Sequence, residues 1–205
     1  MLSAHGLTCE RGERLLFRNL DFELGAGEAL LVRGGNGRGK TSLLRILCGL
    51  SAPAAGEVRW RGEAIARARE RYGREMTYVG HANGIKDDLT PLENLRLAAA
   101  LGGRALGEDA AKAALARVGL ARCIDLPARV LSFGQRRRVA LAGLATAGAH
   151  LWILDEPLAG LDVDGVAMVE AMIGEHVRAG GLAIMTTHQA LRLEGLIPQT
   201  LSVGD

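Results

Sequence analysis

A glycine-rich run constrains the fold of this chain more than any other feature of its sequence. It extends from Gly34 to Thr41, reads Gly-Gly-Asn-Gly-Arg-Gly-Lys-Thr, and fits the pattern G-x-x-x-x-G-K-[ST]. The apolar run Ala29 to Val32 precedes it, and a segment with helical spacing, Ser42 to Leu50, follows it. A chance glycine-rich turn would not need these flanks. A loop of this kind between a strand and a helix predicts a phosphate-binding loop in an α/β fold.

The loop supplies the groups that a nucleotide phosphate requires. Its glycines allow backbone N–H groups to turn toward phosphate oxygens, and the following helix adds its positive N-terminal end. Lys40 is expected to reach the β and γ phosphates, and Thr41 to bind Mg²⁺. The predicted nucleotide contacts in this region are Gly34, Gly35, Asn36, Gly37, Arg38, Gly39, Lys40, Thr41 and Ser42.

Two adjacent carboxylates end the apolar run that begins at Leu151. We expect Asp155 to hold Mg²⁺, directly or through water, and Glu156 to polarise the water that attacks the γ-phosphate. An acidic turn that only caps a strand is the alternative. ATP hydrolysis is favoured because a further motif, Leu131-Ser132-Phe133-Gly134-Gln135, precedes this run.

Composition adds limits rather than a function. The chain has 205 residues, of which 48% are hydrophobic, so it can bury a sizeable core. A formal charge of +2 gives no reason to expect nucleic acid or anionic lipid as the main partner. The three cysteines, which form no C-x-x-C pair, are expected to be reduced and structural. The longest uncharged stretch, Val139 to Leu154, has 16 residues, too few to span a bilayer. We therefore expect a soluble, cytoplasmic chain without a signal peptide.

Apolar runs predict the strands. Short runs in the opening third predict a small β layer, and two continuous runs later in the chain predict parallel strands buried on both faces. A helical segment from Val166 to Ala179 separates the two later strands. The expected strands of the β layer are Leu15 to Phe17, Leu20 to Leu24, Ala29 to Val32 and Val58 to Trp60, and the expected parallel strands are Leu151 to Leu154 and Leu182 to Met185.

Three other segments have helical spacing. Arg61 to Glu75 mixes arginine, glutamate and alanine, which favours a solvated helix over a basic recognition helix. Leu92 to Gly119 predicts two helices, broken near Gly102 and Gly103, that form a helical lobe. The consecutive arginines Arg136 to Arg138 could form a nucleic-acid patch, but we expect a solvated helical turn.

Five motifs, taken in order, resemble those of the ABC ATPases. They are the phosphate loop, Leu-Ser-x-Gly-Gln at 131–135, the pair Asp155-Glu156, Asp162 after Ala-Gly-Leu, and His188 after Met-Thr-Thr. The resemblance covers essentially the whole chain. It implies an α/β P-loop NTPase core with a mostly parallel sheet, a small N-terminal antiparallel β layer and an inserted helical subdomain. A single domain would then span 1–205, with 1–85 and 139–205 as the nucleotide-binding core and about 86–138 as the helical subdomain.

The resemblance also implies roles for individual residues. In that family two subunits pack head to tail around ATP and Mg²⁺. Ser132, Gly134 and Gln135 would contact the γ-phosphate bound by a second copy of the chain, and Asp162 would connect the two sites. His188 would position the γ-phosphate and water, and would act in catalysis with Lys40 and Glu156.

Several segments are similar to one branch of that family, the cytochrome c maturation ATPases, also described as haem exporter ATP-binding subunits. These segments are Tyr78 to His81, Gly84 to Lys86, Leu89 to Leu95 and Ile153 to Pro157. The similarity implies a peripheral subunit on the cytoplasmic face of the inner membrane, bound to an integral permease and haem-handling subunits. Its ATP hydrolysis would serve haem delivery or release of a haem-loaded chaperone, without direct contact with the cargo and without nucleic acid.

Other readings stay open at this level. The ATPase of a transporter with another cargo would share the same chemistry. ABC-type ATPases of DNA repair or translation usually carry tandem cassettes or a long coiled coil inserted between the two phosphate-site motifs. Such a function is disfavoured here, because only a compact stretch joins Lys40 to Ser132. A GTPase is disfavoured because the sequence has no N-K-x-D motif.

Three residues depart from the family pattern. His81 falls where most members have glutamine, and Mg²⁺ prefers oxygen to an imidazole nitrogen. Arg11 falls near the aromatic residue that usually stacks on adenine, although an arginine plane can also stack on a base. Arg38 replaces a small residue of the phosphate loop. It either assists phosphate binding or points outward, and we expect it to point outward.

Overall fold

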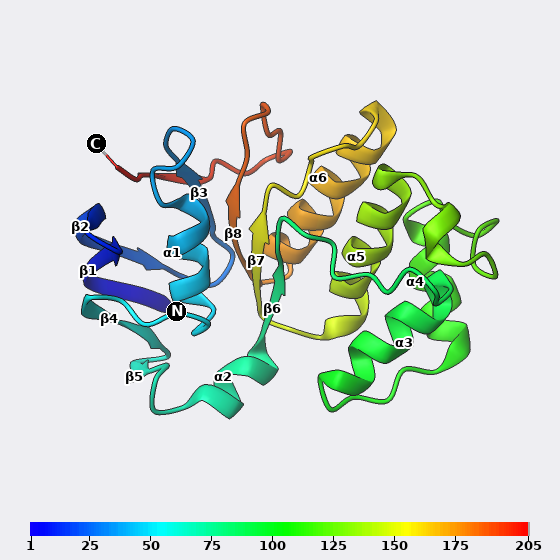
Figure 1. The fold of residues 1–205 in the computed structure, drawn as a ribbon, viewed down its shortest axis with the longest axis horizontal. Coiled ribbons are helices and arrows are strands. Elements are labelled where there is room, and N and C mark those ends of the chain that lie inside the picture. Colours follow the sequence, from blue (N-terminus) through cyan, green and yellow to red (C-terminus); the bar gives the residue numbers. More distant parts are fainter. Residues whose placement is uncertain (205) are drawn as a thin grey trace.

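The computed structural model describes residues 1–204, which form two sheets and a set of helices (Figure 1). A four-stranded antiparallel sheet and a five-stranded parallel sheet make up the nucleotide-binding side of the molecule. The elements are β1 Leu2–Arg11, β2 Arg14–Leu24, β3 Ala29–Arg33, α1 Lys40–Leu47, β4 Ala55–Trp60, β5 Glu63–Ala64, α2 Arg69–Glu75, β6 Met76–Val79, α3 Pro91–Leu101, α4 Glu108–Arg117, the 3₁₀ helix η1 Ala128–Val130, α5 Phe133–Ala147, β7 Leu151–Asp155, α6 Val163–Arg178, β8 Leu182–Thr186 and β9 Gln199–Ser202.

The parallel sheet has the strand order β6-β7-β8-β3-β9. Every residue of β7 and β8 is buried, and their register places Asp155 opposite Thr186 at the carboxyl ends of the strands. The two predicted parallel strands are therefore confirmed. Helices cover this sheet on both faces (Figure 1), which explains why its central strands β7, β8 and β3 are largely continuous apolar runs, whereas the edge strand β9 is mostly exposed.

The strand β3 corrects one expectation. We placed Ala29 to Val32 in the small β layer, but β3 lies between β8 and β9 in the parallel sheet. Its four apolar residues are all buried, as is typical of a strand covered on both faces. Its position brings the phosphate loop, which follows β3, to the carboxyl edge of the sheet.

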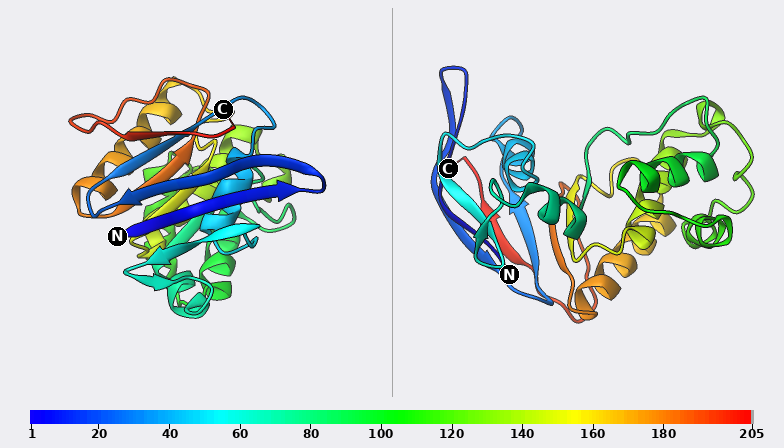
Figure 2. Two further views of the ribbon diagram at one scale, coloured as in Figure 1. Left: turned by 90° about the vertical axis from the view of Figure 1, so that its left-hand side faces the viewer. Right: turned by 90° about the horizontal axis from the view of Figure 1, so that it is seen from below.

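The antiparallel sheet has the order β2-β1-β4-β5, and its strand β1 was not expected from the sequence. Leu2 and Leu7 of β1 are fully buried in a cluster that also contains Leu43 and Leu47 of α1. The same cluster includes Ile184 of the parallel sheet. Helix α1 thus lies between the two sheets (Figure 1), and the hairpin of β1 and β2 projects beyond them (Figure 2).

The segment from Arg61 to Glu75 is helical only in its second half. Arg61 and Gly62 both have positive φ, 51° and 83°, and connect β4 to β5 in a tight hairpin. Helix α2 begins at Arg69, and its arginines are exposed. The expected solvated face is present, but on a shorter helix.

The helical subdomain packs α3, α4 and α5 together (Figure 1). Helix α3 ends at Leu101 and Gly103 adopts a φ of 71°, which confirms the predicted break. Helix α5 continues from this subdomain to Ala147, so the predicted boundary at 138 falls inside one helix. Within residues 1–204, no helix is long and apolar enough to cross a bilayer.

Candidate functional site

A pocket at the carboxyl edge of the parallel sheet brings most of the predicted site residues together. The phosphate loop forms one wall, the ends of β7 and β8 form another, and the hairpin of β1 and β2 closes the far side. The residues that line it are Arg11, Arg14, Leu16, Gly35, Asn36, Gly37, Gly39, Lys40, Thr41, Ser42, His81, Asp155, Glu156 and His188.

The backbone of the phosphate loop requires glycine at two positions. Gly34 has a φ of 152°, and a Cβ there would lie 2.5 Å from the carbonyl oxygen of Val203. Gly39 has a φ of 103° at the start of α1. Lys40 donates hydrogen bonds from Nζ to Gly34 O at 2.7 Å and Gly35 O at 3.3 Å. The ammonium group is therefore held over the loop, where a phosphate would be bound.

Asp155 lies at the centre of a buried hydrogen-bonded chain. Thr41 donates to its Oδ2 at 2.8 Å, and Thr186 donates to its Oδ1 at 2.7 Å. The carboxylate is 2% exposed and Thr186 is fully buried. The hydroxyl of Thr41 and the carboxylate of Asp155 form an all-oxygen donor pair beside the phosphate loop. This donor set fits Mg²⁺, which prefers oxygen ligands and usually takes one or two from the protein.

Glu156 has an unusual backbone and an unpaired oxygen. Its φ is 52°, a left-handed conformation that costs a non-glycine residue free energy. Its amide donates to Thr186 Oγ1 at 2.9 Å, and its Oε2 accepts from the backbone N–H of His188 at 3.2 Å. Its Oε1 is buried, lies 3.5 Å from His188 Nε2, and has no hydrogen-bond partner within residues 1–204. This carboxylate is thus placed to accept a proton or a hydrogen bond from a substrate water.

The arginine run corrects a second expectation, because it is not a solvated turn. Arg137 is 1% exposed and donates to the carbonyl oxygens of Gly80, Asp155 and Glu156 at 2.7–2.8 Å. Burial lowers the pKa of its guanidinium, against the opposing effect of the charges on Asp155 and Glu156. Arg136 pairs with an aspartate of the helical subdomain, and Arg138 pairs with Asp162. All three side chains are therefore bound by acceptors of the same chain, and Arg137 is the one that is buried.

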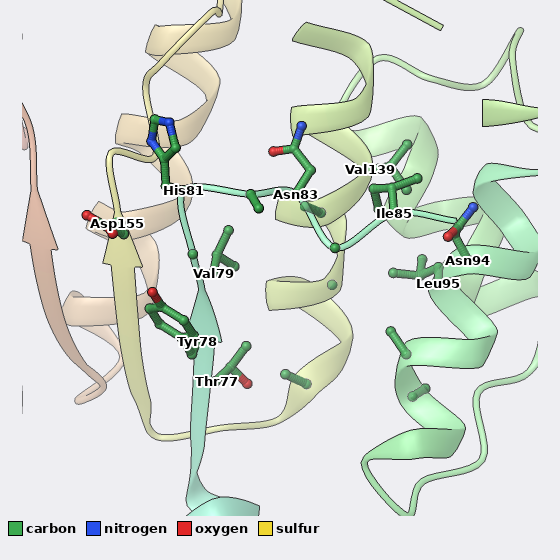
Figure 3. A pocket seen from close by; sticks show the side chains of 18 of the residues that line it. Thr77, Tyr78, Val79, His81, Asn83, Ile85, Asn94, Leu95, Val139 and Asp155 are labelled. Atoms are coloured by element: carbon green, nitrogen blue, oxygen red, sulfur yellow. The ribbon is translucent and has the colours of Figure 1, made fainter. Parts of the chain in front are cut away.

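The residues that depart from the family pattern occupy different places. His81 is exposed at the start of the segment that leads from β6 to the helical subdomain (Figure 3), and it lines the pocket. Arg11 and Arg14 line the far end of the pocket, at the tip of the hairpin. Arg38 is exposed, lies against Gly204 and is not among the lining residues, in line with the outward orientation that we expected.

Ser132, Gly134, Gln135 and Asp162 do not join this pocket; they lie together around a separate hollow. Ser132 Oγ accepts from the Gln135 amide at 3.1 Å, and Gln135 Oε1 accepts from the Ser132 amide at 2.9 Å, which caps α5. Asp162 caps α6, and its bond with Arg138, followed by that with the Gly165 amide, lowers the pKa of its carboxyl. Within one chain, these four residues are not assembled with Lys40.

Comparison with known proteins decides the family. The sequence profile of the family described as "ABC transporter" matches residues 17–159, which include the phosphate loop, Ser132 and Glu156. The chain belongs to the ABC transporter family. This family is the one that the order of motifs predicted, and its ATP-binding members of this type are ATPases.

Curated relatives match over nearly the full length. The chain is 54% identical over 191 residues to the cytochrome c biogenesis ATP-binding export protein CcmA of Nitrosomonas europaea, covering 93% of this chain and 90% of that protein. It is 50% identical over 204 residues to the CcmA of Dechloromonas aromatica, covering 100% of each. The resemblance to the cytochrome c maturation branch is thereby confirmed.

Solved structures confirm the fold class. A putative ABC transporter ATP-binding protein from Pyrococcus furiosus superposes with a TM-score of 0.85 at 21% identity, over 98% of this chain and 96% of that chain. A dimeric ATP-binding cassette with bound ADP and phosphate superposes with a TM-score of 0.81 at 23% identity, over 92% and 88%.

Two residues of the candidate site escaped the sequence reasoning. Thr186 joins Asp155 to the Glu156 amide, and Arg137 binds the carbonyl groups behind them. A polar residue that ends a fully apolar strand was the available signal for Thr186. Arg137 gave no such signal, because adjacent arginines usually face solvent.

Proposed function

We propose that this chain is the ATP-hydrolysing subunit of a membrane complex for cytochrome c biogenesis, where hydrolysis drives haem delivery or the release of a haem-loaded chaperone. Two kinds of observation support this function. The nearly full-length similarity to the CcmA proteins supports the pathway. The buried, unpaired Oε1 of Glu156 beside His188 is the observation that carries hydrolysis rather than nucleotide binding alone.

Binding of ATP would use the phosphate loop. Lys40 would exchange its bonds to the Gly34 and Gly35 carbonyls for the β and γ phosphates, while the loop N–H groups and the N-terminus of α1 bind the remaining oxygens. Thr41 and Asp155 would hold Mg²⁺, which offsets phosphate charge when bound. Arg11, at the far end of the pocket, is placed to contact the base.

Hydrolysis would depend on Glu156 and His188. The carboxylate orients the attacking water and accepts its proton, and the neighbouring His188 positions the γ-phosphate and that water. His81 borders the same space and would act through hydrogen bonds rather than as a metal ligand, because imidazole nitrogen suits Mg²⁺ poorly.

A second copy of the chain would complete the site. Ser132, Gly134, Gln135 and Asp162 lie on a surface of their own, away from Lys40. In a head-to-tail dimer these residues would contact the nucleotide bound to the partner, and Asp162 would link the two sites.

The chain would work as a peripheral subunit on the cytoplasmic face of the inner membrane. An integral permease and haem-handling subunits would be its partners, and the cargo itself would not contact it. The near-neutral net charge gives no reason to expect nucleic acid as a partner. We also propose the division into a nucleotide-binding core and a helical subdomain within one domain, with α5 shared between them.

A deletion strain tests the pathway. Loss of this protein is expected to abolish covalent haem attachment to c-type cytochromes and to spare b-type cytochromes, as read by haem staining and difference spectra. Wild-type protein and Lys112→Ala should restore attachment, because Lys112 is exposed on α4, where it pairs with Glu108. Lys40→Ala should not restore it. Normal c-type cytochromes in the deletion strain would reject the cytochrome c assignment and favour an ABC ATPase for another cargo.

A further inference from the structure

Arg137 carries a buried charge that the proposed hydrolysis does not explain. Among residues 1–204 it is the only buried basic side chain, and it forms no ion pair. Its acceptors are neutral oxygens, namely the carbonyls of Gly80, Asp155, Glu156 and Pro157 and the side chain of Asn83. Burying an unpaired charge costs free energy. A charge kept in this position is therefore expected to order the groups to which it is hydrogen-bonded.

One end of this network fixes the backbone of Glu156. Arg137 Nη2 donates to Glu156 O at 2.8 Å, and Thr186 Oγ1 accepts from Glu156 N at 2.9 Å. The two peptide groups that flank the left-handed φ of 52° are therefore both held by side chains. Because the direction of the Cα–Cβ bond follows from the backbone conformation, these bonds fix the position and direction from which the Glu156 side chain extends into the pocket.

The other end holds the segment that carries His81. Arg137 Nη1 donates to Gly80 O at 2.7 Å and to Asn83 Oδ1 at 3.2 Å. Figure 3 shows this segment passing from β6 to the helical subdomain, where Asn94 binds the amide and the carbonyl of Lys86. One guanidinium thus connects a segment between the two parts of the molecule to the residue proposed to act on water.

We propose that Arg137 is a positioning residue for ATP hydrolysis. It holds Glu156 in a fixed position relative to the segment that carries His81. This proposal rests on the role proposed above for Glu156. The planar fork of arginine reaches acceptors in three directions, whereas lysine has one compact ammonium. Lysine would preserve the positive charge but could not make the same set of hydrogen bonds. The rate of hydrolysis should therefore fall, while the affinity for ATP should be kept.

The test compares Arg137→Lys with Arg136→Lys, the same change one residue earlier on α5, where the side chain lies nearer solvent and pairs with Asp87. For the purified full-length chain, we expect Arg137→Lys to lower kcat at least about 10-fold and to leave the Kd for ATP within about 3-fold. Arg136→Lys should match the wild type in both. Asn83→Ala removes one acceptor of Arg137 from a half-buried position and should lower kcat several-fold. If Arg137→Lys does not fold, the kcat of Asn83→Ala tests the proposal instead.

A double-mutant cycle separates positioning from general damage. If Arg137 acts through Glu156, adding Arg137→Lys to Glu156→Gln should leave the residual rate within about 2-fold. If the two substitutions instead lower the rate additively, or if ATP-binding capacity falls in proportion to the rate, the proposal is wrong. A kcat within 2-fold of wild type in both Arg137→Lys and Asn83→Ala would also overturn it. Wild-type hydrolysis by Glu156→Gln alone would instead refute the role proposed for Glu156.

Discussion

Replacing Thr186 by valine removes one hydroxyl from the centre of the proposed ATPase site and keeps the shape of the side chain. That hydroxyl donates to Asp155 Oδ1 and accepts from the Glu156 amide, and Thr186 is fully buried. Each polar group left without its partner costs about 1–3 kcal/mol, and two are affected. We expect the free energy of unfolding to fall by about 3 kcal/mol. At about 2–4 °C per kcal/mol for a chain of this size, Tm should fall by about 6–12 °C.

The same change should slow hydrolysis. Without the Thr186 bond, the Glu156 amide loses its side-chain acceptor, and the left-handed backbone keeps only the bonds that its carbonyl accepts from Arg137 and from the Ala159 amide. We expect kcat to fall at least about 10-fold, since reacting groups must be held within a fraction of an ångström. Urea unfolding and phosphate release measure the two effects.

Thr186→Ser is the matched control, because it keeps the hydroxyl and removes one methyl group. It should cost about 1 kcal/mol and leave kcat within about 3-fold. Equal stability and equal kcat in Thr186→Val and Thr186→Ser would refute the reasoning that this hydroxyl organises the site.

Three further changes have defined outcomes. Lys40→Ala should weaken ATP binding about 10- to 150-fold, because a hydrogen bond from a charged group contributes about 1.5–3 kcal/mol; titration against Lys112→Ala measures it, and equal affinities would contradict it. Asp155→Asn should weaken nucleotide binding mainly when Mg²⁺ is present, and an equal loss in EDTA would exclude a metal role. Burial lowers the pKa of His176 from the ordinary 6.5, so the unfolded chain takes up its proton first. The contribution of His176 to stability is therefore present above pH 6.5 and lost as pH falls toward its folded pKa. His176→Gln should lose less stability than the wild type between pH 7.5 and 5.5 in urea titrations, and an equal loss in both would contradict this.

Much of this site could be predicted because its chemistry fixes residue types at fixed spacing. The phosphate loop needs glycines before Lys40. Asp155 is the last residue of a strand whose other residues are all apolar, and Glu156 follows it. The later parallel strands were predictable for the same reason, since both faces are covered. The misplacement of β3 shows the limit of this reasoning, because a short apolar run does not say which sheet it joins.

Other features depend on contacts between segments that lie far apart in the sequence. Arg137 is buried only because the Gly80 and Glu156 carbonyls, 57 and 19 residues away, meet at one point. The pairing of Arg138 with Asp162 across 24 residues is of the same kind. Neither periodicity nor composition contains this information, so the arginine run resembled an ordinary solvated turn.

The central claim is that this chain hydrolyses ATP with Glu156 as the group that acts on water. Glutamine keeps the shape of that side chain and cannot accept a proton. The decisive measurement is phosphate release by purified Glu156→Gln, with gel filtration in ATP and in ADP on the same protein. The account predicts a rate about 10²- to 10⁴-fold below wild type. It also predicts a dimer in ATP that reverts to monomer in ADP, and that Ser132→Arg disrupts this dimer. Hydrolysis by Glu156→Gln at the wild-type rate would contradict the account.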